Sequence, residues 1–310
     1  MPAPVISIKG LRKSYGELEA VRGIDLEVQR EEILAVLGPN GAGKTTTVEI
    51  LEGYRDRDAG EVEVLGVDPA EPTRAWREKI GMVLQGTTLE GKLSVRESLD
   101  LYAGYYENPR PVDEVISLVG LEEKAEFRAG KLSGGQARRL DVGIALIGDP
   151  ELLFLDEPTT GFDPSARRQA WEMIAGLRDL GKTVLLTTHY MEEAQFLADR
   201  VAIINEGRIV AEDTPENLGD RDQLPTRITF RVPEGIDLED LAAIGEVNFE
   251  KGGSGPGRLA VIESHDSVTV LNRLTGWAIE RQLDLDSLEV RRPSLEDVYL
   301  QLTETQVDEA

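Results

Sequence analysis

The stretch GPNGAGKTT, Gly38–Thr46, restricts the possible folds more than any other part of the chain. It matches the pattern G-x-x-x-x-G-K-S/T without a mismatch, and it stands between the apolar run EILAVLG and a helical pattern that starts near Lys44. In such a loop the glycines allow backbone N–H groups to face a polyphosphate, Lys44 supplies a cation for the β- and γ-phosphates, and Thr45 offers a hydroxyl to Mg²⁺. The sequence therefore predicts a nucleoside triphosphate site, without a choice between adenine and guanine.

The apolar runs of the first two thirds of the chain predict an α/β fold. The runs EILAVLG, ELLFLDE, KTVLLTTH and VAIINEG are continuous rather than alternating, as in strands that are buried on both faces of a sheet. Helical patterns such as TTVEILEGYR and SARRQAWEMIAGLRDLG lie between several of them, so we expect a largely parallel sheet. Residues 86–150 show helical spacing and no clear strand. They are expected to form a helical subdomain or, alternatively, two helices on the same sheet.

A second domain is expected after a polar linker. The stretch DTPENLGDRDQLPT follows the last apolar run and is rich in charged and turn-forming residues. We therefore place a nucleotide-binding domain at residues 1–218 and a C-terminal accessory domain at residues 219–310. The accessory domain has the pattern strand-helix-strand-strand-helix-strand, which indicates either a small ferredoxin-like domain or an irregular α+β tail.

The composition excludes several kinds of function. The formal net charge is −24, whereas a nucleic-acid binder needs a basic surface, so no nucleic-acid partner is expected. The chain has no cysteine, which rules out disulfides, thiolate metal sites and cysteine nucleophiles. It has no apolar run near the roughly 18 residues that span a bilayer, and its N-terminus has no signal-peptide core. These features predict a soluble, cytoplasmic chain.

Two carboxylates end the apolar run LLFLDE, and a histidine ends the run KTVLLTTH. Carboxylates at the carboxyl end of a buried strand point to the crevice where α/β folds bind ligands. We assign Asp156 to Mg²⁺ and Glu157 to general-base catalysis on an attacking water. His189 is placed to reach a γ-phosphate. The alternatives are a solvated strand terminus for the carboxylates and a capping or core role for the histidine.

A second glycine-rich stretch, LSGGQ, begins at Leu132. Ser133 and Gln136 fit the capping box S-x-x-Q at the start of the helical pattern ARRLDVGIALIG. A helix N-terminus carries free N–H donors and a partial positive charge, and paired glycines leave room for a close approach. The stretch is therefore expected to cap its own helix and also to accept a phosphate.

These motifs, taken in order, resemble those of the ATP-binding subunits of ABC transporters, and the resemblance covers Val5 to about Leu218. GPNGAGKTT is similar to the Walker A motif of that family, LLFLDE to Walker B, LSGGQ to the signature motif and GFDP to the D-loop. The resemblance implies a P-loop NTPase fold of the ABC type that uses ATP and Mg²⁺. It implies catalytic roles for Glu157, His189 and Gln85, nucleotide contacts from Tyr15, Asn40, Gly41, Gly43, Lys44, Thr45, Thr46, Ser133, Gly135 and Asp163, and metal contacts from Thr45, Gln85 and Asp156.

In that family two ATPase subunits pair head to tail, and each signature loop closes over the nucleotide of the other subunit. The resemblance therefore implies a homodimer in which Ser133 and Gly135 contact the γ-phosphate in trans, and in which ATP joins the subunits until it is hydrolysed. One departure from the pattern is Phe162, where leucine is usual in the D-loop.

The C-terminal stretch RRPSLEDVYLQLTE and the stretch THYMEEA resemble ATPases that serve ABC-2 type exporters of drugs and antibiotics. This resemblance implies export of a small hydrophobic or amphipathic molecule through a separate ABC-2 type permease, with the chain on the inner face of the cell membrane. The alternatives are an ATPase of repair or translation, an importer subunit, and a non-catalytic regulator. A regulator is disfavoured because Glu157 and LSGGQ are intact.

Overall fold

The computed structural model describes residues 3–84, 90–218, 224–232, 236, 241, 244–250, 258–285, 287–292 and 295–304. The chain divides into two compact units, Met1–Pro215 and Glu216–Ala310. The division falls after Pro215, whereas the sequence placed the boundary after Leu218. In the part of the chain that the structure describes, no helix combines the length and the apolar character that a membrane span needs.

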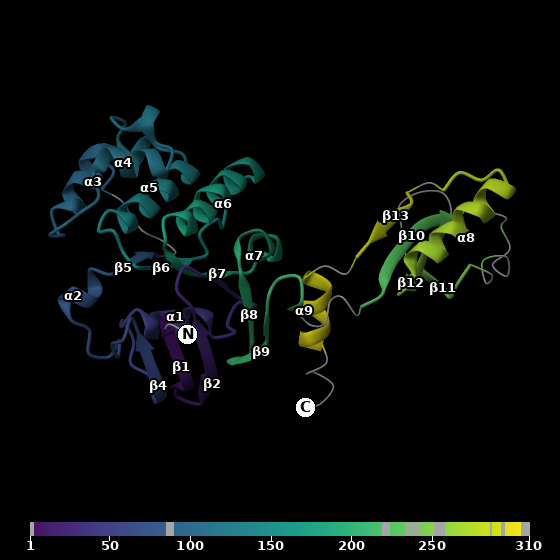
Figure 1. The fold of residues 1–310 in the computed structure, drawn as a ribbon, viewed down its shortest axis with the longest axis horizontal. Coiled ribbons are helices and arrows are strands. Elements are labelled where there is room, and N and C mark those ends of the chain that lie inside the picture. Colours follow the sequence, from purple (N-terminus) through teal and green to yellow (C-terminus); the bar gives the residue numbers. More distant parts are fainter. Residues whose placement is uncertain are drawn as a thin grey trace. The chain divides into compact units, whose positions relative to one another are not determined.

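A six-stranded sheet forms the centre of the large unit, with the strand order β5-β6-β7-β3-β8-β9 (Figure 1). The first five of these strands run parallel, and β9 pairs antiparallel with β8 at the edge. All residues of β3, β6 and β7 are buried, which confirms the expectation from the continuous apolar runs. The strands are β3 Ile33–Leu37, β5 Ile80–Val83, β6 Leu152–Asp156, β7 Thr183–Thr188, β8 Arg200–Asn205 and β9 Arg208–Asp213.

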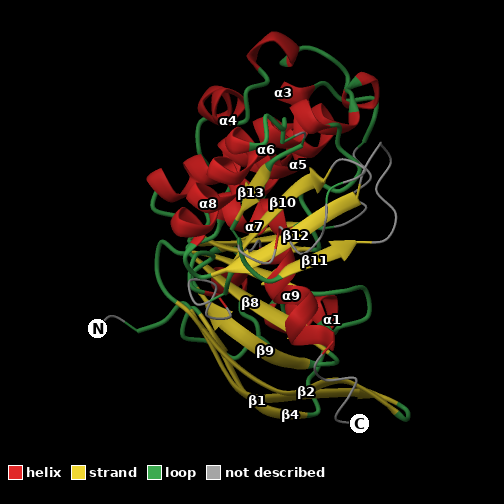
Figure 2. Cartoon of the chain, turned by 90° about the vertical axis from the view of Figure 1, so that its right-hand side faces the viewer, coloured by secondary structure: helices red, strands yellow, loops and turns green. Residues whose placement is uncertain are grey.

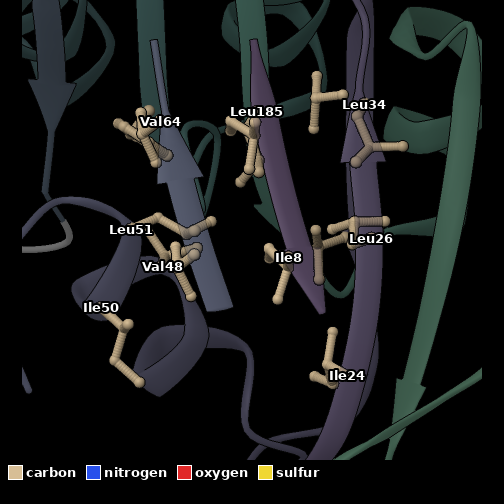
Figure 3. Close-up of a cluster of buried hydrophobic side chains, with 14 of the residues drawn as sticks. Ile8, Ile24, Leu26, Leu34, Val48, Ile50, Leu51, Val64 and Leu185 are labelled. Atoms are coloured by element: carbon tan, nitrogen blue, oxygen red, sulfur yellow. The ribbon is translucent and has the colours of Figure 1, made fainter. Parts of the chain in front are cut away.

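A second, antiparallel sheet, which the sequence reading did not identify, has the order β2-β1-β4. Its strands are β1 Ile6–Tyr15, β2 Leu18–Val28 and β4 Ala59–Val64. They are buried only at some positions, so they lack the continuous apolar runs that mark the central strands. The hydrophobic core shown in Figure 3 lies between this sheet, the central sheet and helix α1, Lys44–Leu51. Its labelled side chains are Ile8, Ile24, Leu26, Leu34, Val48, Ile50, Leu51, Val64 and Leu185.

The helices α3, α4 and α5 form a group of their own in the large unit (Figure 1). They pack on one another, and α5 also packs on β5 and α6. The helical subdomain expected near residues 86–150 therefore forms, and its helix α5 contacts the central sheet. Ser94 and Ser133 begin α3 and α5 with capping boxes. The helices of the large unit are α1 Lys44–Leu51, α2 Arg74–Arg77, α3 Val95–Ala103, α4 Val112–Leu118, α5 Gly134–Leu146, α6 Pro164–Asp179 and α7 Met191–Leu197, with 3₁₀ turns at Glu122–Lys124 and Ala129–Lys131.

The small unit contains an antiparallel sheet with the order β11-β12-β10-β13 and a long helix, α8, on one face (Figure 2). This order is that of a ferredoxin-like domain. Phe230, Ile262 and Trp277 are among the side chains that join the sheet to α8. The first predicted helix of the pattern falls largely outside the described residues. The elements are β10 Thr226–Val232, β11 Val247–Glu250, β12 Arg258–Ser264, α8 Ser267–Glu280, β13 Glu289–Arg291 and α9 Leu295–Glu304.

Candidate functional site

The loop between β3 and α1 is held in a tight curve by two glycines. A Cβ on Gly38 would lie 2.3 Å from the carbonyl oxygen of Ile204, and a Cβ on Gly43 would lie 2.4 Å from that of Ala20. Gly43 also has a φ of +104°, in the left-handed region that favours glycine. The loop therefore needs these glycines in order to pack against β8 and β2.

The same loop presents donors to the solvent. Gly41 has a φ of +83° and open space where a Cβ would stand. Asn40 and Thr45 are exposed, and Thr46 is half-buried. Because α1 begins at Lys44, the N–H groups of its first turn have no acceptor within the helix, and they carry the positive end of the helix dipole. This geometry suits an anion such as a polyphosphate.

Lys44 is a buried cation in the first turn of α1. Its Nζ donates to the carbonyl oxygens of Gly38, at 2.7 Å, and Pro39, at 3.1 Å. Burial lowers the pKa of Lys44, and the nearby Glu157 and Asp156 oppose that shift. The ammonium group is thus held over the loop and within electrostatic reach of both carboxylates.

The carboxylates stand at the carboxyl end of β6, beside β7. Asp156 is buried, and its Oδ1 accepts a hydrogen bond of 2.5 Å from Thr187 Oγ1. Glu157 has a φ of +44°, which a residue with a Cβ rarely adopts, and its N–H donates to the backbone oxygen and to the hydroxyl of Thr187, both at 3.1 Å. Thr187 therefore holds the carboxylate of Asp156 and the backbone of Glu157, and nothing in the run KTVLLTTH marks it for this role.

The side chain of Glu157 faces His189. Glu157 Oε1 lies 3.2 Å from His189 Nδ1, and Oε2 accepts from Thr160 Oγ1 at 3.1 Å. The side chain of Glu157 is 11% exposed and that of His189 is 37% exposed, so water can reach the pair from one side. Since β7, which ends just before His189, lies between β6 and β3, the order of the parallel strands brings the predicted cation, carboxylates and histidine to one edge of the sheet.

Tyr15 ends β1 beside the same loop. Its hydroxyl oxygen is 3.5 Å from Thr46 Oγ1, and the ring is partly exposed. The guanidinium carbon of Arg55 lies 5.2 Å from the ring centroid, and Arg55 is paired with Glu49 at 2.6 Å. An aromatic ring in this place is suited to stack on a nucleobase. No pattern in the sequence marks Arg55 as a neighbour of this ring.

The LSGGQ stretch caps α5. Gln136 N donates to Ser133 Oγ at 3.3 Å, and Ser133 N donates to Gln136 Oε1 at 3.0 Å, so the capping box is confirmed. The two glycines differ. A Cβ on Gly135 would lie 3.2 Å from the Cβ of Ala166 on α6, whereas a Cβ on Gly134 would meet nothing within 4 Å. Packing within the chain explains Gly135 and leaves Gly134 free for a contact from outside.

The starts of α5 and α6 lie side by side. Asp163 caps α6 by accepting from Ser165 N at 3.0 Å and Ala166 N at 2.9 Å. A shallow hollow of about 210 Å³ lies between the two helix starts, and Ser133, Gly135 and Asp163 line it. In both Figure 1 and Figure 2, α5 lies away from α1 within the large unit. The starts of α5 and α6 thus lie together, apart from the Lys44 loop.

The comparisons with known proteins agree with this geometry. A family profile described as "ABC transporter" matches residues 21–160. A daunorubicin resistance ATP-binding protein of Streptomyces coeruleorubidus is 36% identical, over 98% of this chain and 97% of its own length. A Nod factor export ATP-binding protein I of a Rhizobium species is 38% identical, over 98% of each chain.

The chain is an ATP-binding subunit of the ABC transporter family. A second profile, "ABC transporter domain-containing protein-like, C-terminal domain", matches residues 226–294, within the small unit. Among solved structures, the subunit cbiO1 of Clostridium perfringens, part of the ABC transporter complex cbiONQ, has a TM-score of 0.63 and 26% identity over 70% of this chain and 90% of its own. The cassette MJ0796, solved as a dimer with ADP and Pi, has a TM-score of 0.60 and 25% identity over 67% of this chain and 98% of its own. The predicted P-loop fold of the ABC type is confirmed.

In this ABC subunit one group of motifs lies at the carboxyl ends of the central strands: the Walker A loop, the Walker B carboxylates and His189. The signature loop and the D-loop lie together at the starts of α5 and α6. Gln85, for which a catalytic role and a metal contact are predicted, lies outside the described residues. Among the residues that are described, no group of three or more His, Asp or Glu side chains is arranged as a metal site. The hydroxyl of Thr45 and the carboxylate of Asp156 are nevertheless the hard oxygen donors that suit Mg²⁺, which usually keeps water and phosphate ligands as well.

A further buried carboxylate lies near Walker B. Glu52, at the end of α1, is buried, and its Oε1 has no hydrogen-bond partner among the described residues. Burial raises the pKa of Glu52 to about 8, with smaller contributions from Asp156 and Glu49. The carboxyl of Glu52 is therefore mostly protonated at neutral pH in the folded ABC subunit.

This shift makes stability depend on pH. Between pH 4.5 and about 8 the unfolded chain ionises Glu52 and the folded chain does not, so folding loses about 1.4 kcal/mol per pH unit from this group as pH rises. We expect Glu52→Gln, which stays neutral, to raise the melting temperature at pH 8 and to lose this advantage toward pH 4.5. Thermal unfolding across this range tests the prediction, and Glu123→Gln, at an exposed glutamate of the 3₁₀ turn Glu122–Lys124, is the control. An equal gain at all pH values would contradict it.

Proposed function

We propose that this chain is the ATP-hydrolysing subunit of an exporter that moves a small hydrophobic or amphipathic molecule through a separate ABC-2 type permease. The proposal rests on one observation: a phosphate-binding cation and a general base lie close together at the carboxyl ends of the central strands. The residues are Lys44, Asp156, Glu157 and His189. The nearly full-length relatives named for drug resistance and Nod factor export support the transport direction. Their names favour export over the importer and repair alternatives.

ATP binding is assigned to the Walker A loop. The N–H groups of the loop and of the first turn of α1, with Lys44, hold the phosphates, and Tyr15 stacks on the adenine. The other nucleotide contacts come from the same segment, from Asn40, Gly41, Gly43, Thr45 and Thr46. Thr45 and Asp156 would hold Mg²⁺ together with Gln85, and the ion would supply charge neutralisation at the phosphates.

Hydrolysis is assigned to Glu157 and His189. Water attacks the γ-phosphorus, Glu157 accepts a proton from that water, the new O–P bond forms, and the bond to ADP breaks. His189 orients the carboxylate through the 3.2 Å contact and contacts the γ-phosphate. Glu157 has a left-handed backbone conformation, and the bonds to Thr187 stabilise that unusual conformation.

Two subunits are proposed to pair head to tail. Ser133 and Gly135 then contact the γ-phosphate of the partner's nucleotide, and Asp163 of the D-loop lies beside them. The open space at Gly134 supports an approach from outside, and the cassette MJ0796 is a dimer in its solved structure. The subunit would act in the cytoplasm, on the inner face of the membrane beside its permease, without a nucleic-acid partner.

Reconstitution with the permease tests this function. The chain is co-expressed with a candidate ABC-2 type membrane protein from the same genome, and the two are reconstituted in lipid vesicles. We expect the two proteins to co-purify and the permease to change the rate of ATP hydrolysis. Association with DNA or ribosomes in place of the permease would contradict the export assignment.

Lys44→Ala should weaken ATP binding by about tenfold or more, because it removes the cation that faces the β- and γ-phosphates. Isothermal titration calorimetry measures the affinity. Lys182→Ala is a matched control, since Lys182 is also buried but pairs with Asp149 at 2.6 Å. Lys182→Ala should lower the melting temperature and leave the ATP affinity unchanged. Equal ATP affinities of the wild type and Lys44→Ala would show that Lys44 does not contribute to ATP binding.

A further inference from the structure

Arg138 lies in the second turn of α5, and its side chain reaches backbone carbonyls in two other segments. Its Nη1 donates to Leu84 O at 2.6 Å, its Nη2 donates to Asp156 O at 2.6 Å, and its Nε donates to Pro158 O at 3.2 Å. The side chain is only 12% exposed, and Asp141 Oδ2 lies 3.9 Å from Nη1. One guanidinium therefore joins the helix of the signature loop to the ends of β5 and β6.

Two of these bonds flank Glu157 in the sequence. Asp156 and Pro158 are the residues before and after it, and Glu157 itself has the left-handed φ of +44°. The N–H of Glu157 is held by Thr187 on β7. The backbone around Glu157 is thus fixed from β7 on one side and from α5 on the other, and such unusual conformations persist only where the surroundings hold them.

The chemistry of arginine suits this arrangement. Its planar guanidinium carries five N–H donors in a rigid fork, so three acceptors in different directions can be bonded at once. A lysine keeps the positive charge but donates from a single nitrogen, and a glutamine keeps the hydrogen-bonding character without the charge or the reach. Neither side chain can reproduce all three bonds.

We propose that Arg138 is a positioning residue for ATP hydrolysis, which holds the backbone around Glu157 and links it to the helix that begins with the signature loop. This inference rests on the proposed role of Glu157 as the base. Through Arg138, a shift of α5 when the signature loop engages the partner's nucleotide would move the carbonyls on either side of Glu157. Hydrolysis at one site would thereby respond to engagement at the other.

The first test separates turnover from binding in the full-length chain. Because a misplacement of about 1 Å can cost up to 10²-fold in rate, we expect Arg138→Gln to lower kcat by about tenfold or more. The dissociation constant for ATP should stay within about twofold, because the three hydrogen bonds of the Arg138 side chain go to Leu84, Asp156 and Pro158, outside the Walker A loop that holds the phosphates. Arg138→Lys should recover only part of kcat. Arg110→Gln is the control, since Arg110 is 16% exposed and pairs with Glu114 and Asp149 instead.

Equal loss of stability in the Arg138→Gln and Arg110→Gln variants, with kcat unchanged in both, would show a merely structural role and overturn the proposal. Arg138→Lys serves the same comparison if Arg138→Gln does not fold. A fall in ATP affinity that matches the fall in kcat would also overturn it.

The second test combines Arg138→Gln with Glu157→Gln. If Arg138 acts through Glu157, its replacement should not lower the residual single-turnover rate of Glu157→Gln further, since residues that act as a unit are non-additive. An additional loss as large as in the wild type would overturn the proposal while leaving Glu157 as the base. Near-normal hydrolysis by Glu157→Gln alone would instead refute the proposed function itself.

Discussion

Glu157→Gln is expected to lower steady-state ATP hydrolysis by about 10²-fold or more, because the removal of a general base usually has an effect of at least this size. Glutamine has the shape of the glutamate and can still meet Thr160 and His189, which now lie 3.1 Å and 3.2 Å from the carboxylate oxygens. It cannot accept the proton of the attacking water. ATP affinity should remain within about twofold of the wild type, since the phosphate contacts lie in Walker A.

The same variant should accumulate as an ATP-bound dimer. Since ATP joins the proposed pair and hydrolysis separates it, blocked hydrolysis leaves the paired state populated. Size-exclusion chromatography with light scattering, with and without ATP and Mg²⁺, measures the dimer, and phosphate release measures turnover. Glu151→Gln is the control, because Glu151 precedes the opposite end of β6 and pairs with Arg30 and Lys79. Hydrolysis by Glu157→Gln within about threefold of the wild type would contradict the base assignment.

Gly134→Asp is expected to abolish ATP-driven pairing and to leave the monomer folded and able to bind ATP. A Cβ at Gly134 would meet nothing within 4 Å, whereas a Cβ at Gly135 would lie 3.2 Å from the Cβ of Ala166, so Gly134 gives the cleaner test. An aspartate in the first turn of a helix is favourable by about 0.3–1 kcal/mol. The capping role of the loop alone therefore predicts an unchanged or slightly higher melting temperature and normal pairing. A phosphate that approaches from a partner would instead meet a like charge in a poorly screened interface.

A mixing experiment decides whether the signature loop acts in trans. The Gly134→Asp chain keeps its Walker A loop, and a Lys44→Ala chain keeps its signature loop. Each mixed dimer then has one composite site with both parts intact, so some ATP hydrolysis should return relative to either variant alone. The two chains carry different affinity tags, so that association is measured directly. If the chains are folded and associate but no activity returns, the trans assignment is wrong.

The sequence identified those features of the site that depend on short stretches of chain. The Walker A spacing, the glycines of its loop and the capping box at Ser133 are local patterns, because backbone conformation and first-turn hydrogen bonds are set within a few residues. The buried parallel strands were recognisable since burial on both faces requires a continuous apolar run. The antiparallel sheet β2-β1-β4 was not recognisable from the sequence, because its strands are only partly buried and lack continuous apolar runs.

By itself, the sequence therefore determined the family, the nucleotide loop and the residue types available for hydrolysis. Only the tertiary structure decided which of them meet. Thr187 fixes Asp156 and Glu157 because β6 and β7 are neighbours, and Arg138 reaches Glu157's flanking carbonyls because α5 packs beside the ends of β5 and β6. These partners are far apart along the chain, up to 54 residues for Arg138 and Leu84, so no local pattern encodes their contact. The physical reason is that strand order and helix packing, which minimise exposed apolar surface over the whole unit, set these distances.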